Sequence, residues 1–185
     1  MQQIFIGDVQ GCARELRELI RRARHRFGED CEIWQVGDLV NKGPDNLAAL
    51  ELMREEVDRG RGHFVLGNHD LHLIRVLAGI VPLFPGDSLR DVQESAEAAD
   101  WLAWLRGQPL VMPLYIDETP ALMVHAAVHP RWTLPQCVER ARAVEKRLSS
   151  PEQDDWVGLL ETLPRRSGSV MAEAAAGSGA ELRDD

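Results

Sequence analysis

The sequence predicts an α/β fold built on a mostly parallel sheet. Three short apolar runs, residues 4–6, 33–36 and 64–66, alternate with two longer segments whose apolar residues recur with a helical period. The order strand, helix, strand, helix, strand is typical of parallel sheets with helices packed on them. The chain has 185 residues, is 44% hydrophobic and 28% charged, and is expected to form one domain over residues 1–163.

The two helices between these strands carry clear signals. The first is predicted over residues 13–27, where one face is apolar and the opposite face is rich in arginine; the apolar face consists of Leu16, Leu19, Ile20, Ala23 and Phe27. The second begins at Pro44 and Asp45, because proline and an oxygen-bearing cap favour a helix start. It ends before Gly60, which breaks the helical pattern.

Beyond residue 66 the predicted elements are shorter and less regular. They are a helix over 71–77, a loop over 83–93, a helix over 94–106, a hairpin formed by 114–116 and 122–124, and helices over 136–148 and 154–163. Residues 164–185 are rich in Ala, Gly and Ser and lack apolar periodicity. That segment is predicted to be a disordered tail.

Composition excludes several classes of protein. No apolar run reaches 18 residues, and no basic segment leads into an apolar stretch at the start, so we expect a cytoplasmic protein without a membrane span. Cys12, Cys31 and Cys137 form no CxxC pair and are expected to be free thiols. The net charge of −9 argues against general nucleic-acid binding, so an anionic substrate requires bound cations or a local basic group.

Each of the three apolar runs is followed by a glycine and then by one residue with an oxygen-bearing side chain. Asp8, Asp38 and Asn68 occupy these positions, at steps of 30 residues. Because the carboxyl ends of neighbouring parallel strands face one crevice, we expect the three side chains to converge. Two converging carboxylates repel each other unless a cation lies between them, which predicts a divalent metal site bridged by Asp38. A single Gly-Asp pair would more simply be read as a turn.

Three further positions extend this pattern. His69 and Asp70 complete the stretch GNHD, and His69 is a candidate for protonating a leaving oxygen while Asp70 orients its ring. His125 follows the second strand of the predicted hairpin and is a candidate metal ligand. Lys42 stands four residues after Asp38 in a loop bounded by glycine and proline, where its ammonium group can hold a phosphate oxygen. A surface histidine and a solvated lysine are the simpler interpretations of such residues when they occur alone.

The stretches GDVQG, GDLVNKGP, GNHD and HA, in this order, resemble the calcineurin-like metallophosphoesterases. The longer stretches GNHDLHL, WLRGQPL and HAAVHPRW are most similar to the symmetrical bis(5'-nucleosyl)-tetraphosphatases within that family. The resemblance runs from residue 1 to about 150–163. It implies a β-sandwich flanked by helices. Family members continue through further strands that complete the second sheet. This chain is therefore expected to lack part of that sheet at its C-terminal side.

The resemblance also implies a dinuclear metal centre and a reaction. One metal would be held by Asp8 and Asp38, and the other by Asp38, Asn68 and His125. His69 would assist the leaving group and Lys42 would hold phosphate. The expected ions are Mn or Co, with Fe or Zn as alternatives, since the donor set mixes carboxylate, amide oxygen and imidazole. The family substrate is diadenosine tetraphosphate, which is cut in the middle to give two ADP.

Two departures from the family pattern leave alternatives open. Gln10 stands where the family motif GDxHG has a histidine ligand, and a neutral amide oxygen is a weaker ligand than imidazole. The family also supplies a later metal-binding histidine, whereas this chain has none after His129. The predicted function is therefore hydrolysis of dinucleoside polyphosphates, with a catalytically impaired nucleotide-binding relative as the alternative and a protein Ser/Thr phosphatase as the third possibility. The sequence does not give the oligomeric state.

Overall fold

The structure, a computed structural model, describes residues 2–163. The predicted tail over residues 164–185 lies outside this part. In chain order the elements are β1 (Gln3–Ile6), α1 (Ala13–Phe27), β2 (Glu32–Gln35), α2 (Asn46–Asp58), β3 (Gly62–Phe64), α3 (Asn68–Leu77), α4 (Arg90–Gln93), α5 (Ala98–Arg106), β4 (Val111–Ile116), β5 (Thr119–Val124), α6 (Leu134–Leu148) and α7 (Gln153–Glu161).

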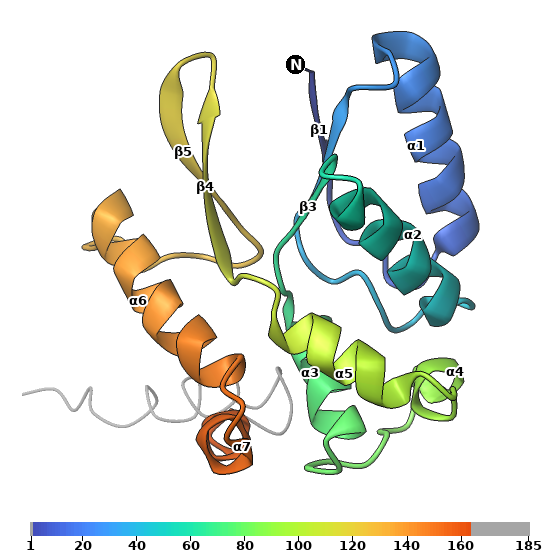
Figure 1. Cartoon of the computed structure of the whole chain (residues 1–185), viewed down its shortest axis with the longest axis vertical. Coiled ribbons are helices and arrows are strands. Elements are labelled where there is room, and N and C mark those ends of the chain that lie inside the picture. Colours follow the sequence, from blue (N-terminus) through green and yellow to red (C-terminus); the bar gives the residue numbers. More distant parts are fainter. Residues whose placement is uncertain (1, 164–185) are drawn as a thin grey trace, which may run out of the picture.

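The first three strands form the predicted parallel sheet. Its strand order is β1-β2-β3, and its register pairs Ile4 with Ile33 and Ile33 with Gly62. Helices α1 and α2 both lie on one side of the sheet (Figure 1), as expected when two consecutive crossovers of the same hand connect neighbouring strands. The buried side chains of Ile6, Ile33 and Phe64 belong to the core that these helices close.

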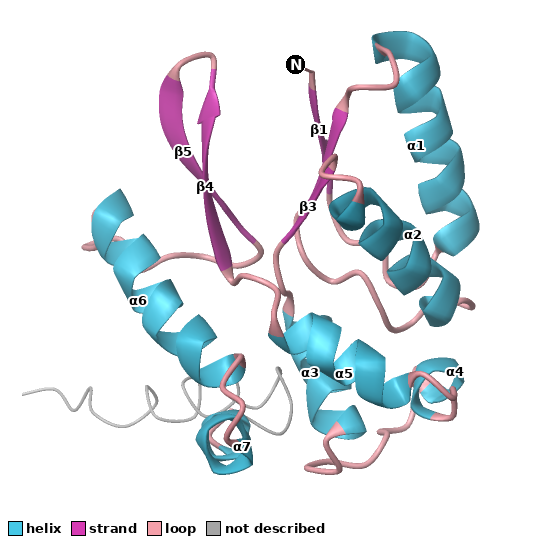
Figure 2. Cartoon of the chain, viewed as in Figure 1, coloured by secondary structure: helices cyan, strands magenta, loops and turns pink. Residues whose placement is uncertain are grey.

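The hairpin forms a second sheet on the other side. Strands β4 and β5 are antiparallel and stand apart from the parallel sheet in Figure 2. A small separate core joins the two sheets, and its buried members are Trp34, Val65, Leu114 and Met123. The main-chain N–H of Leu66 also donates to the carbonyl of Pro109, at 2.8 Å. The arrangement is a mixed α/β fold in which a hairpin faces a helix-backed sheet.

Several predicted boundaries were wrong; a tertiary contact explains one of them and a local helix cap explains another. The segment 83–93 was expected to be a loop, but its end forms α4, because Asp91 accepts hydrogen bonds from the N–H groups of Asn46 and Leu47 at 2.8 and 3.1 Å. Helix α3 begins at Asn68 rather than at residue 71, because the Asp70 carboxylate accepts the N–H of Gly67 at its start.

Smaller differences affect the remaining elements. Helix α5 begins at Ala98 rather than 94, the third strand runs over Gly62–Phe64 rather than 64–66, and both hairpin strands are longer than predicted. All three cysteines are free thiols, as expected. Among residues 2–163, no helix combines the length and apolarity needed to cross a membrane.

The small core between the sheets predicts a test of hairpin docking. Leu114 is 7% exposed within that core, whereas Ile116 is 45% exposed on the same strand. We expect Leu114→Ala to lower the free energy of unfolding by about 2–3 kcal/mol, because it leaves a cavity between the sheets. Ile116→Ala should change it by less than about 0.5 kcal/mol. Urea denaturation measures both, and equal effects would show that the hairpin does not depend on this core.

Candidate metal centre

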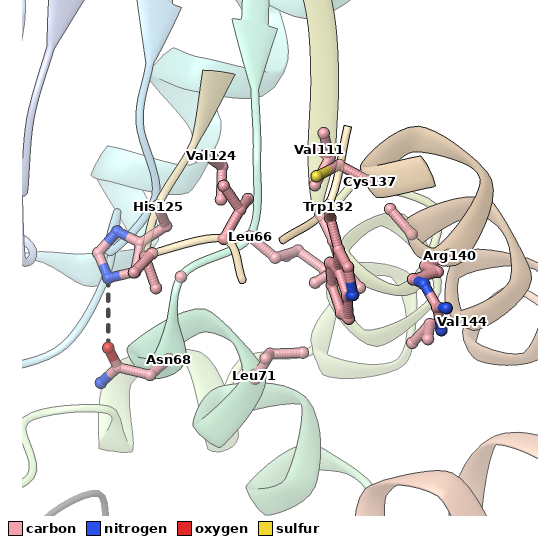
Figure 3. A pocket seen from close by; sticks show the side chains of 16 residues that line it. Leu66, Asn68, Leu71, Val111, Val124, His125, Trp132, Cys137, Arg140 and Val144 are labelled. Carbon is pink, nitrogen blue, oxygen red and sulfur yellow. Dashed lines mark hydrogen bonds between the residues drawn. The ribbon is translucent and has the colours of Figure 1, made fainter. Parts of the chain in front are cut away.

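The structure brings four predicted ligands together where the parallel strands end. Asp8, Asp38 and His125 each offer a ligand atom, and these atoms lie within 4.8 Å of one another. The His125 Nε2 atom is 3.4 Å from Asp38 Oδ1 and 3.2 Å from Asn68 Oδ1, the contact drawn in Figure 3. Carboxylate, amide oxygen and imidazole at these separations fit a divalent transition-metal ion.

Asp38 is held at the middle of this group by its main chain. Its φ of 55° places it in the left-handed region, directly after Gly37 at φ 81°. Its side chain is buried, and Oδ1 accepts the main-chain N–H of His69 at 2.9 Å. That N–H belongs to the first turn of α3, where the helix dipole stabilises a negative charge. Asp38 is thus a buried carboxylate pointed at the other ligands.

Two glycines in the repeated pattern allow the ligands to approach. A Cβ on Gly67 would overlap the carboxylate of Asp38, and a Cβ on Gly37 would lie 2.6 Å from Nδ1 of His125. Gly7, at the corresponding place after β1, has no atom within 4 Å of such a Cβ. Close packing therefore explains why Gly37 and Gly67 are glycines. It does not explain Gly7, where a Cβ would meet no other atom.

His125 is oriented for binding through Nε2. Its Nδ1 is 2.8 Å from the carbonyl oxygen of Val36. Because a carbonyl only accepts hydrogen bonds, Nδ1 carries a proton, and Nε2 is the ring nitrogen left to bind a cation. Nε2 faces the side-chain oxygens of Asp38 and Asn68. A main-chain acceptor behind a histidine is the usual arrangement for a metal ligand.

Gln10 lies beside Asp8, as its sequence position predicts. Its Nε2 is 3.4 Å from Asp8 Oδ2. The amide nitrogen therefore faces the carboxylate, and the amide would have to turn for its oxygen to bind a metal. His129 lies elsewhere: its ring packs on Trp132 at a centroid distance of 5.4 Å, and its Nδ1 accepts the N–H of Arg131 at 3.3 Å.

Asp70 makes contacts different from those predicted. Instead of orienting the His69 ring, its fully buried carboxylate accepts main-chain N–H groups from Asp38 and Gly67 at 2.8 Å and from Leu39 at 3.0 Å. Burial, together with the nearby charge of Asp38, raises the pKa of Asp70 to about 7, against the effect of these hydrogen bonds. Asp70 therefore shapes the site through the main chain.

The contact to the His69 ring comes from Asn41, which the sequence analysis missed. Asn41 Oδ1 accepts the N–H groups of Lys42 at 2.8 Å and Ser88 at 3.1 Å, so its Nδ2 is the atom 3.1 Å from His69 Nδ1. Nδ1 must then accept, and the proton of the neutral ring is on Nε2. This Nε2 lies 3.8 Å from Asp38 Oδ2. The only sequence signal was the position of Asn41 inside GDLVNKGP.

Asp87 anchors Asn41 from the segment before α4. Its Oδ1 accepts Asn41 Nδ2 at 2.9 Å, and its Oδ2 lies 2.7 Å from both His72 Nε2 and the N–H of Phe84. Burial opposes ionisation, but the hydrogen bonds from Asn41, His72 and Phe84 lower the pKa of Asp87 to about 2. No sequence signal marks this residue, because it lies in a segment predicted to be a loop.

Lys42 points toward the same segment. Its Nζ donates to the carbonyl of Gly86 at 3.2 Å and lies 3.6 Å from Asp87 Oδ1. The side chain is 46% exposed, which leaves it free to turn. The structure therefore places Lys42 at the edge of the site, on a main chain with φ 66°, and not directly against the ligand cluster.

The contact between Gly67 and Asp38 predicts that a larger residue at position 67 lowers both stability and metal binding. Gly67 has φ −100° and ψ −179°, which alanine adopts without strain, so only the overlap with Asp38 opposes Gly67→Ala. We expect Gly67→Ala to be destabilised by more than about 2 kcal/mol and to lose most of its metal affinity. Gly7→Ala, the matched control, should retain both. Thermal melts and metal titration calorimetry measure these effects, and unchanged metal binding in Gly67→Ala would contradict the geometry.

The lowered pKa of Asp87 predicts a pH-dependent contribution to stability. A carboxyl whose folded pKa is below its unfolded value of 3.8 stabilises the fold above that value, and the contribution is lost as pH falls toward about 2. Asp87→Asn should therefore destabilise the protein at pH 6. We expect the stability difference from the unaltered protein to shrink by about 1 kcal/mol at pH 3. Urea denaturation at both pH values measures the change, and a constant difference would indicate that folding does not lower the pKa of Asp87.

Comparisons with known proteins agree with this geometry. Residues 1–165 match the family described as Calcineurin-like phosphoesterase. Proteins named "Bis(5'-nucleosyl)-tetraphosphatase, symmetrical" are 39% identical over 160 residues in Shewanella baltica (strain OS155 / ATCC BAA-1091) and 42% identical over 151 residues in Edwardsiella ictaluri (strain 93-146). The matches cover 86% and 81% of this chain but 56% and 52% of those proteins, so the chain spans about half their length.

A solved structure shares the fold. A crystal structure of a candidate diadenosine tetraphosphatase superposes with a TM-score of 0.55 and 29% identity, and the match covers 72% of this chain and 54% of that one. The two parallel-strand carboxylates, the histidine after the hairpin and the family match over residues 1–165 lead to one assignment. The chain belongs to the calcineurin-like phosphoesterase family.

Proposed function

We propose that the chain hydrolyses dinucleoside tetraphosphates and cuts diadenosine tetraphosphate into two ADP. The observation that carries this proposal is the convergence of Asp8, Asp38 and His125 within 4.8 Å at the end of a parallel sheet. The names of the relatives at 39% and 42% identity support the substrate class. Free cysteines suit a reducing compartment, and we propose the cytoplasm as the location.

Two divalent ions fit the ligand cluster. Asp8 and Asp38 would hold one, and Asp38, Asn68 and His125 the other, with Asp38 shared. Mn or Co suits this donor set best, and Fe or Zn are alternatives. When bound, such ions polarise the phosphoryl oxygens and activate the attacking water. The buried charge of Asp38 and the exposed charge of Asp8 supply the attraction that holds them.

The chain's own residues complete the site around phosphate. His69 presents Nε2–H toward the cluster because Asn41 occupies its Nδ1, so Nε2 is the atom that donates to the leaving oxygen. Lys42 is free to turn from Gly86 and to hold a phosphate oxygen as a point charge. On a chain of net charge −9, such local cations are needed to offset repulsion of a polyanion.

One specific observation also favours a catalytically impaired, nucleotide-binding relative. Gln10 directs its amide nitrogen toward Asp8, and its side chain offers a metal only a neutral amide oxygen. Loss of a residue that only supports a metal ligand typically lowers metal affinity or activity by about 10–100-fold. A weaker ligand at position 10 is therefore expected to lower both. A protein Ser/Thr phosphatase is the third candidate, and the names of the relatives weigh against it.

The decisive experiment combines metal analysis with product analysis of the purified chain. After loading with Mn or Co, we expect two ions per chain and ADP as the sole nucleotide product from diadenosine tetraphosphate. ATP plus AMP as products would contradict symmetrical cleavage. Nucleotide binding without turnover would favour the impaired relative, and phosphate release from a phosphopeptide alone would favour the protein phosphatase.

The weak ligand at position 10 gives a gain-of-function prediction. Gln10→His should raise metal affinity and the kcat/KM for diadenosine tetraphosphate by at least about tenfold, because imidazole binds Mn or Co more strongly than an amide oxygen does. Gln153→His, at an exposed position at the start of α7, is the matched control and should change neither value. If Gln10→His behaves like the control, residue 10 takes no part in metal binding.

A further inference from the structure

A cavity of about 370 Å³ opens beside the ligand cluster. Figure 3 shows Asn68 and His125 on one side of it, and Trp132, Arg140 and Val144 on the other. Its volume lies in the range of small-molecule sites. Because Asn68 and His125 belong to both the cavity wall and the ligand cluster, a molecule whose phosphates reach the metal ions can extend directly into this cavity.

The walls between these two ends are apolar. They are formed by Leu66 from the segment between β3 and α3, Leu71 from α3, Val111 and Val124 from the hairpin, and Ala141 from α6. None of the residues that line the cavity in the described part of the chain is an aspartate or a glutamate. Such an apolar wall suits an uncharged planar group that is attached to a phosphate chain. It suits the charged phosphate groups themselves less well.

Trp132 supplies an accessible aromatic ring in this cavity. The residue is 40% exposed, unlike the buried Trp34, Trp101 and Trp156. The Arg140 guanidinium lies 4.7 Å from the centroid of its ring, and the ring of His129 lies 5.4 Å away on a tilted plane. These neighbours restrict the indole while leaving part of it open. A fixed aromatic ring of this kind is a platform on which nucleobases stack.

We propose that this cavity binds one nucleobase of the substrate, stacked on Trp132, while the attached phosphates reach the ligand cluster. The inference rests on the proposed function, since it assigns part of the same substrate. Stacking is available to every base, and the apolar walls offer few side-chain groups for hydrogen bonds. The site is therefore tolerant, and adenine and guanine nucleotides bind with similar affinity.

The test measures binding rather than turnover, in the full chain loaded with Mn. Isothermal titration calorimetry gives the Kd of ADP, GDP and pyrophosphate for the unaltered protein and for Trp132→Ala. We expect Trp132→Ala to weaken ADP and GDP by about tenfold or more, because it removes the stacking surface. Pyrophosphate, which carries no base, should bind equally to both proteins. Trp132→Phe keeps an aromatic ring and should recover part of the loss.

Two further variants control for structural damage. Tyr115 is 67% exposed on β4 and does not line the cavity, so Tyr115→Ala removes a comparable aromatic ring and should leave ADP affinity unchanged. Ala127 is exposed at the cavity wall, and Ala127→Leu should fill the space and weaken ADP but not pyrophosphate. This second variant keeps the test valid if Trp132→Ala folds poorly.

The outcomes separate the base site from the proposed reaction. Base-dependent binding that falls in Trp132→Ala, in a chain that does not hydrolyse diadenosine tetraphosphate, would retain the base site and reject the reaction. ADP that binds no more tightly than pyrophosphate, or that binds Trp132→Ala and Ala127→Leu as tightly as it binds the unaltered protein, would overturn the base site even in an active enzyme. A preference of more than about a hundredfold for ADP over GDP would contradict the stacking account.

Discussion

The buried carboxylate of Asp70 is the constraint on which the site depends. It accepts N–H groups from Asp38 and Leu39 on one loop and from Gly67 on another, and so joins the end of β2 to the start of α3. This junction fixes the left-handed main chain of Asp38 and places the N–H of His69 against its carboxylate. The two carboxylates are close enough that Asp38 contributes to the raised pKa of Asp70. A divalent cation beside Asp38, as proposed, would offset this concentration of negative charge.

The second requirement is that the hairpin reaches the parallel sheet. His125 comes from the end of β5, in a different sheet from the strands that precede Asp8 and Asp38. Its Nδ1 donates to the carbonyl of Val36, which fixes both the position and the tautomer of the ring. The small core around Trp34 and Met123 supports that contact. The proposed ligand cluster therefore depends on packing between two sheets, and the cavity lined by Trp132 continues from the same junction.

The parallel sheet and the grouping of the ligands could be predicted from sequence because both follow from spacing. The 30-residue steps place Asp8, Asp38 and Asn68 at one edge, and the period of residues 13–27 gives the bounds of α1. The contacts of Asp70 and the Asn41–Asp87 pair could not be predicted, since Asn41 and Asp87 are 46 residues apart in sequence. They also depend on loop conformation, because Asn41 and Lys42 have φ values of 77° and 66°. Helix α4, over Arg90–Gln93, is too short to show periodicity and is stabilised by tertiary contacts.

The central claim is that Asp8, Asp38, Asn68 and His125 share cations at the edge of the parallel sheet. Anomalous diffraction at the manganese absorption edge, from crystals grown with Mn, tests it most directly. The account predicts two anomalous peaks, one on each side of the Asp38 carboxylate, with His125 Nε2 bound to one of the two ions. No anomalous peak next to Asp38, or a peak held by other residues while His125 Nε2 binds no ion, would contradict it.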